Sequence, residues 1–188
     1  MELEKIREEI DAIDPELRKL LMRRLNASYE VARAKKEAGS FDIFRADREE
    51  AILSRLGEGI PEDRKAGYLA VVRKIMETSR MYQYGLLYDW TPGLFQELFG
   101  DLAIAPDCSR VRVRLTREDR PNAMSAILSM IGDRGFNMER MELTYEDKDA
   151  GTVTFELVIC GDLNRAEMQK LMFQLSKESK DFAILETF

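Results

Sequence analysis

Residues 3–37 read LEKIREEIDAIDPELRKLLMRRLNASYEVARAKKE, with apolar residues recurring at steps of three and four. This spacing places the apolar side chains on one face of an α-helix, and it predicts that the helix ends near Ala38-Gly39. Asp14-Pro15 allows two interpretations. The helix is either continuous with a kink before Pro15, or capped at Asp14 so that a second helix begins at Pro15. We expect one long helix.

The length of this helix has a consequence for assembly. At 1.5 Å per residue it is roughly 50 Å long. Two shorter helices are expected after it, at about 47–57 and from Ile60-Pro61 to near Leu87. These two helices cannot cover the whole apolar face of the long one. An uncovered apolar face of this length predicts a symmetric homodimer.

The period of the apolar residues changes in the second half of the chain. Alternation predicts strands at 111–116, 138–145, 152–160 and 182–188, and helical spacing predicts helices at 121–133 and 164–176. The order β-α-β-β-α-β is that of a ferredoxin-like fold. We therefore expect an all-α three-helix domain at 1–90, a linker with one short helix at 91–109, and an α+β domain at 110–188.

Composition restricts the classes of function. With 45% hydrophobic and 34% charged residues the chain is typical of a soluble globular protein, and its net charge of −6 argues against nucleic-acid binding. No membrane-spanning segment or signal peptide is predicted. Cys108 and Cys160 have no paired spacing, which favours free thiols in a reducing cytoplasm.

The chain contains no histidine. It therefore lacks the commonest metal ligand, and Ser–His and Cys–His nucleophile systems are excluded within it. An enzyme of this composition is expected to work without a proton shuttle or to use carboxylates or lysine. We expect no metal and no cofactor.

Charged residues on the expected helices form the candidate site. In FRADREEAIL (44–53), the spacing of Asp47 and Glu50 predicts a capping box, which leaves Arg48 and Glu49 without an explanation. Arg24 and Lys35 are eleven residues apart, so they share a helix face roughly 16 Å apart. They can converge on a ligand or simply be solvated.

Four segments resemble the all-helical class of chorismate mutases over about residues 3–90. They are IREEIDAID (6–14), LLMRRLNASYEVARAKKE (20–37), FRADREEAIL (44–53) and METSRMYQYGLL (76–87). The resemblance implies a subunit of three helices that dimerises through the long helix. It also implies rearrangement of chorismate to prephenate without a cofactor.

The same resemblance implies roles for single residues. Those that match the family's site are Arg7, Arg24, Lys35, Arg48, Glu49, Ser79 and Gln83. Arg7 and Arg24 would bind the substrate carboxylates, Arg7 coming from the partner subunit because it lies roughly 25 Å from Arg24 along the helix. Lys35 and Gln83 would donate to the ether oxygen, and Glu49 would accept from the hydroxyl. Gln83 and Ser79 could instead bond each other or the backbone, and Arg45 stands where some members carry an acid.

The second half resembles an ACT domain, a module that senses amino acids, through REDRPNAMSAIL (117–128) and GFNMERMEL (135–143). The resemblance is greatest to the regulatory domain of mutase–prephenate dehydratase proteins. The segment 91–109 is too short to contain their dehydratase domain. An effector would bind at a subunit interface where the loop before Met124 faces the start of the next strand. The implied contacts are Asn122, Ala123, Met124, Asn137 and Met138. Pro121–Met124 and Glu142–Tyr145 depart from the family's motifs, so the module could instead serve dimerisation only.

The expected function is therefore a cytoplasmic, homodimeric chorismate mutase for phenylalanine and tyrosine biosynthesis, sensing an aromatic amino acid. Two alternatives remain open. One is an isochorismate pyruvate-lyase on the same helical fold, and the other is a non-catalytic regulatory subunit. An enzyme is favoured over the regulatory subunit by the simultaneous presence of six residues, namely Arg7, Arg24, Lys35, Arg48, Glu49 and Gln83.

Overall fold

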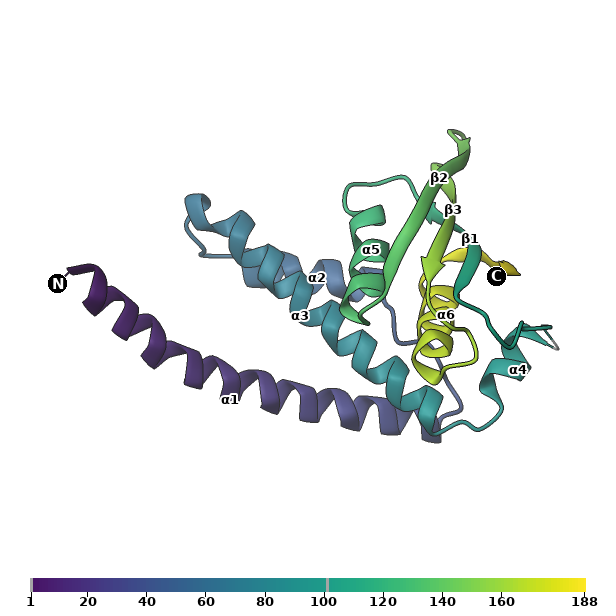
Figure 1. Ribbon diagram of the computed structural model, residues 1–188. Helices are drawn as coiled ribbons and strands as arrows, with labels where there is room; N and C mark the ends of the chain where they lie inside the picture. The colour runs from purple at the N-terminus through teal and green to yellow at the C-terminus, as the bar shows by residue number, and fades with distance from the viewer. Residues whose placement is uncertain (1, 101) are drawn as a thin grey trace.

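The computed structural model describes residues 2–100 and 102–188 (Figure 1). Met1 of the expected helical domain and Asp101 of the expected linker lie outside the described residues. The elements are α1 (Glu2–Glu37), α2 (Ala46–Gly57), α3 (Glu62–Asp89), α4 (Leu94–Phe99), β1 (Arg110–Glu118), α5 (Ala123–Asp133), β2 (Asn137–Asp147), β3 (Thr152–Cys160), α6 (Ala166–Glu178) and β4 (Lys180–Thr187). The expected order is confirmed. Because α1 runs through Pro15, a second helix does not begin there.

The end of α1 follows from its glycine. Gly39 has φ +63°, in the left-handed region that favours glycine. Its N–H donates to the Lys36 carbonyl (3.0 Å), while the N–H of Ser40 donates to the Lys35 carbonyl (2.9 Å). These two bonds make a Schellman motif, which satisfies the last carbonyls of the helix and turns the chain. The predicted stop at Ala38-Gly39 is confirmed.

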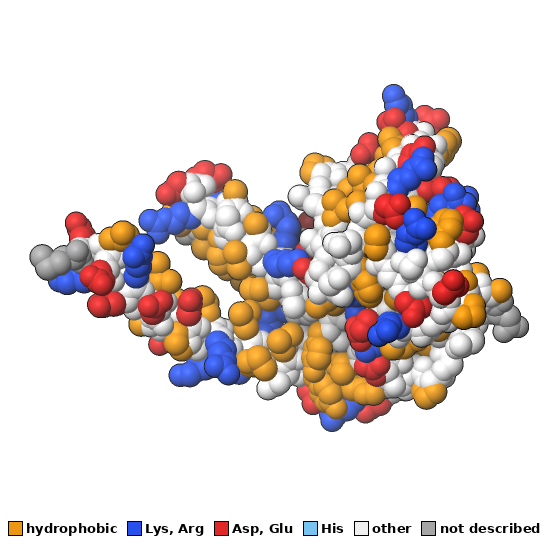
Figure 2. Space-filling view, viewed as in Figure 1, with side chains coloured by type: hydrophobic (Ala, Val, Ile, Leu, Met, Phe, Trp, Pro, Cys, Tyr) orange, Lys and Arg blue, Asp and Glu red, His pale blue; other side chains and the backbone are white. Residues whose placement is uncertain are grey.

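Most of α1 stands clear of the rest of the chain. It packs against α3 through its C-terminal part, where Ser28 and Ala32 are buried. Toward the N-terminus its apolar residues are about half exposed, as at Leu3 (60%) and Ile10 (52%). Figure 2 shows hydrophobic side chains along α1 and along the facing helices α2 and α3, with an open hollow between them. The described chain therefore leaves this apolar face uncovered.

The second half is a four-stranded sheet of order β2-β3-β1-β4, in which every neighbouring pair is antiparallel. Alternate residues of β1 and β3 are buried, which produces one apolar face. Helices α5 and α6 supply the apolar residues that pack on this core. The edge strand β2 is exposed over nearly its whole length, including Leu143 (53%) and Tyr145 (61%).

Helix α6 joins the two halves of the molecule. All five residues from Leu171 to Leu175 are buried, because one side of the helix faces the sheet and the other faces α3. The ring of Phe173 packs edge-on against Tyr84 of α3 (5.4 Å between centroids) and against Phe41 (5.5 Å). Leu94 and Phe95 of α4 are buried as well, so the expected linker is part of the packed structure. The helical half and the sheet half share a continuous interior.

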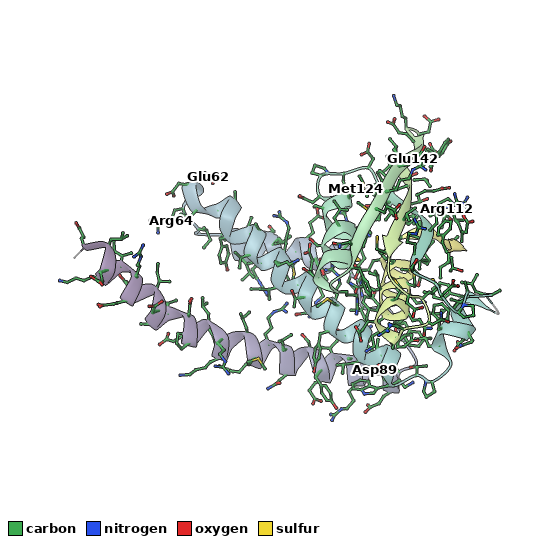
Figure 3. All side chains as sticks on the ribbon, viewed as in Figure 1. Glu62, Arg64, Asp89, Arg112, Met124 and Glu142 are labelled. Carbon is green, nitrogen blue, oxygen red and sulfur yellow. The ribbon has the colours of Figure 1, made fainter. Side chains whose placement is uncertain are left out.

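Charged side chains along α3 show how this helix spans the molecule. Glu62 and Arg64 mark its exposed start, while Asp89 marks its end beside the sheet half (Figure 3). Within the described residues, no helix combines the length and apolar composition needed to cross a membrane.

Candidate active site

A cavity of about 360 Å³ lies among α1, α2 and α3; we refer to it as the helical cavity. It brings together six of the residues expected from the sequence, namely Arg24, Lys35, Arg48, Glu49, Ser79 and Gln83. Arg45 also lines it. Arg7 does not line the cavity, because it lies 17 positions before Arg24 on the same helix, roughly 25 Å away along the axis. The volume is in the range of small-molecule sites.

Arg24 is held by the facing helix. Its Nη1 donates to the Ser79 hydroxyl and to the Ile75 carbonyl (3.2 Å), and the Ser79 hydroxyl donates to the same carbonyl (2.9 Å). Partial burial lowers the pKa of the Arg24 guanidinium, while the Glu49 carboxylate acts in the opposite direction. Arginine remains charged under such conditions. Arg24 is therefore a fixed cation on the cavity wall.

Gln83 and Lys35 supply further donors. Gln83 is 8% exposed, and its Nε2 donates to the Ser79 carbonyl (3.1 Å). Because an amide nitrogen carries two hydrogens, one remains for a ligand. Within the described part of the chain, neither Lys35 nor Arg48 has an ion-pair partner. The helical cavity thus contains more positive than negative charge, although the chain has net charge −6.

The start of α2 differs from the expectation. The capping box at Asp47 and Glu50 is wrong, because the N-cap residue is Arg45 and no side chain caps the helix. Asp47 lies in the first turn and accepts two bonds from the Arg45 guanidinium (2.8 and 3.1 Å). That hydrogen bond lowers the pKa of Asp47. Arg45 is thus partly neutralised at the rim of the cavity.

Arg80 is the residue that sequence reasoning missed. Its side chain is buried and forms ion pairs with Glu49 of α2 and with Glu178 of α6 (3.0 Å from Nε). The guanidinium also lies over the Phe44 ring (4.8 Å). Burial alone lowers the pKa of Arg80, but the carboxylates of Glu178 and Glu49 outweigh it and raise the pKa. Arg80 therefore ties the carboxylate of the candidate site to the sheet half.

A signal for Arg80 existed in the sequence. It lies three residues before Gln83 and four after Met76, so it shares their helix face. Its second partner gave no such signal, because Glu178 is 98 residues away along the chain. Only the packing of α6 on α3 brings the two together.

Only three of the five expected effector residues line the same cavity. A cavity of about 490 Å³, the loop cavity, is lined by Asn122, Ala123 and Met124 together with residues of β2 and β3. Figure 3 shows Met124 at the same side of the sheet half as Glu142 of β2. Asn137 and Met138 do not line this cavity, because they lie at the other end of β2, paired with Cys160 and Ile159. Within one chain, these two residues therefore do not face the loop.

We predict that Arg80→Met lowers the free energy of unfolding by about 3–5 kcal/mol, because it leaves Glu178 buried without its cation. Adding Glu178→Leu should recover most of this loss. The matched control is Lys74→Met, which breaks another pair between the halves, Lys74–Asp133 (2.6 Å), whose side chains are 47% and 29% exposed. It should cost less than about 1 kcal/mol. Urea denaturation measures all three, and equal losses for Arg80→Met and Lys74→Met would contradict the prediction.

Comparison with known proteins finds a family match within the helical half. Residues 6–84 match the family model described as chorismate mutase type II. The match spans most of α1, all of α2 and most of α3, and it includes every residue that lines the helical cavity. A search of curated proteins found no match. The family match implies an isomerase that acts on chorismate.

Proposed function

We propose, from the premise that residues 6–84 are a chorismate mutase type II domain, that the chain converts chorismate to prephenate for phenylalanine and tyrosine synthesis. The observation that carries the proposal is the helical cavity. It places two cations, an amide and one carboxylate from three helices around a single small-molecule space, namely Arg24, Lys35, Gln83 and Glu49.

The reaction explains why these residue types suffice. The rearrangement is unimolecular, so it needs no nucleophile and no proton shuttle, and a chain without histidine loses nothing. The protein must hold the two substrate carboxylates close together, which guanidinium groups do with directional, charge-assisted bonds. Arg24 is already oriented for this by Ser79 and Ile75. We assign the second carboxylate to Arg7 of the partner subunit.

Catalysis requires stabilisation of the charge that develops as the C–O bond breaks. Lys35 and Gln83 would donate to the ether oxygen, and this interaction is stronger in the transition state than in the bound substrate. Glu49 would accept from the substrate hydroxyl, and Arg48 would add positive charge near the carboxylates. Arg80 would act as a positioning residue, because it holds Glu49 from behind.

The proposed assembly is a homodimer formed through α1. The uncovered apolar face of α1 supports it, since a second copy in antiparallel orientation would bury that face. The same orientation brings Arg7 of the partner subunit toward the pocket of this chain. One interaction would thus serve both stability and substrate binding.

For the C-terminal half we propose an ACT domain at 110–188, following a mutase domain at 1–90 and the segment 91–109. The element order and the sheet order β2-β3-β1-β4 support this assignment. Its regulatory role would be to sense an aromatic amino acid at Asn122, Ala123 and Met124, which line the loop cavity. Asn137 and Met138 could contribute only from another chain.

We predict that Lys35→Ala and Gln83→Ala each lower kcat for chorismate at least about 100-fold, because each removes a donor to the ether oxygen. The control is Arg33→Ala, which removes an exposed cation of α1 that pairs with Glu30 (2.7 Å). Absorbance of chorismate measures the rate. Product analysis with chorismate and isochorismate separates a mutase from a pyruvate-lyase. Normal turnover in both site variants would refute the site assignment, and absence of turnover in the wild type would refute the function.

A mixing experiment tests the contribution of Arg7 across the dimer. Arg7→Ala and Lys35→Ala should each be nearly inactive alone. After unfolding and refolding together, mixed dimers contain one site with both defects and one intact site, so about a quarter of wild-type activity should return. If both residues act in the same chain's site, mixing restores nothing.

A binding experiment tests the regulatory role. We predict that phenylalanine or tyrosine lowers mutase activity and releases heat in calorimetry, and that Met124→Lys abolishes both effects by filling the loop cavity. Leu128→Lys, an exposed position of α5, serves as the control. If no aromatic amino acid produces heat, the C-terminal half has a structural role only.

A further inference from the structure

A third cavity, of about 200 Å³, lies at the seam between the helical half and the sheet half; we refer to it as the seam cavity. Its lining comes from the segment before α2 and the first residue of α2, the end of β1 and the residues that follow, and the junction of α6 with β4. The residues are Phe44, Ala46, Thr116, Arg117, Glu118, Arg120, Lys177, Glu178, Ser179 and Lys180. It shares no lining residue with the helical cavity.

The charges around the seam cavity are mainly positive. Four of its residues are cations, and two are acids. The carboxylate of Glu178 is fully buried; its Oε1 accepts from Arg80 and Gln174, while its Oε2 has no hydrogen-bond partner among the described residues. The other acid, Glu118, pairs only loosely with Arg120 (3.7 Å) and Lys180 (3.9 Å), and its side chain is 57% exposed. The cations exceed the carboxylates available to neutralise them.

Arg117 is the most constrained of these cations. It is 7% exposed, its Nη1 donates to the backbone carbonyl of Glu178, and its guanidinium lies over the Phe44 ring (6.0 Å). Among residues 2–100 and 102–188, no carboxylate oxygen lies within 4 Å of the guanidinium nitrogens of Arg117. Burial lowers the pKa of Arg117, partly opposed by Glu178. A buried charge without a counter-ion is costly, which points to an anion as the missing partner.

A second, independent observation comes from Ser179. Ser179 lines the seam cavity. Its Oγ is buried and has no hydrogen-bond partner among the described residues. A buried hydroxyl without a partner loses free energy unless a ligand or water completes its bonding. Beside Arg117 it is a donor that lacks an acceptor. The uncapped start of α2, at Ala46, adds the positive end of a helix dipole to the same wall.

We propose that the seam cavity binds a small oxyanion, a phosphate or carboxylate group, with Arg117 and Ser179 as its principal donors. The volume is below that of sites for drug-sized molecules, which restricts the ligand to a small group. The bound anion would connect α2, β1 and α6 and strengthen the packing of the two halves. The site is independent of the chorismate chemistry. Failure of this proposal would therefore leave the proposed function unaffected, and failure of the proposed function would leave this proposal unaffected.

The test is thermal unfolding and calorimetry of the full chain with inorganic phosphate and, separately, acetate, against sodium chloride at matched ionic strength. A ligand that binds only the folded state raises the Tm with its concentration. We expect this rise with at least one of the two anions in the wild type, and the responding anion identifies the ligand chemistry. Arg117→Met should weaken Kd about tenfold or more, and Ser179→Ala should weaken it less.

Two controls locate the effect. Arg114→Met removes an exposed arginine of the same strand β1 and should leave anion binding unchanged. Arg24→Met removes the fixed arginine of the helical cavity and should also leave it unchanged. Loss of binding in Arg24→Met, or equal binding in Arg117→Met, Ser179→Ala and wild type, would overturn the proposal. No Tm rise and no heat with either anion would also overturn it. If Arg117→Met does not fold, Ser179→Ala decides the outcome.

Discussion

The guanidinium of Arg80 in α3 connects the preceding helix α2 with α6, where Glu178 lies 98 positions further along the chain. Burying a cation to this degree is costly unless carboxylates pair with it, and here one carboxylate comes from α2 and the other from α6. The pairing therefore restricts how the helical half and the sheet half pack against each other. It also determines where Glu49 points in the helical cavity, and it brings the backbone of Glu178 within reach of Arg117. The candidate site and the seam cavity both depend on this one buried charge.

Apolar packing divides the molecule into a firmly packed body and an uncovered arm. Helix α6 is buried on two sides, and Phe173 contacts rings from the helical half, so the body has one continuous interior. The N-terminal part of α1 has no such contacts within the described residues and exposes its apolar face. In the proposed dimer this arm contributes both the interface and Arg7. The apolar face of α1 that a single chain leaves exposed would then be buried between two chains.

Positive charge is concentrated in two cavities of a chain whose net charge is negative. The chain is acidic as a whole, yet the helical cavity and the seam cavity both have excess positive charge. Low-dielectric walls strengthen such local fields, so an acidic protein can still bind carboxylates and phosphates. Fixed cations of this kind match a reaction that needs charge stabilisation and no proton transfer. Histidine is unnecessary for such chemistry.

Short-range patterns predicted much of this structure. Apolar spacing predicted each helix and strand to within a few residues, and the glycine after Ala38 predicted the end of α1. Helical periodicity predicted that Arg24 and Lys35 share a helix face, and both line the helical cavity. The capping box failed although it is also a local pattern, because α2 begins earlier than expected, with Arg45 as its N-cap residue, and Asp47 accepts from the Arg45 guanidinium. Asn137 and Met138 lie at the far end of β2 from the loop cavity of their own chain, because strand register, not sequence spacing, sets which residues share an end of the sheet.

The sequence by itself determined the elements, the two different periods of the halves and the residue types available for the site, since these depend on neighbours within a few positions. Only the tertiary structure decided that Arg80 pairs with Glu178, that α6 is buried on both sides and that Arg117 and Ser179 line one cavity. Arg80 and Glu178, for example, are 98 positions apart. No local pattern encodes these contacts, because they form only when separate apolar faces pack and bring their charged neighbours along.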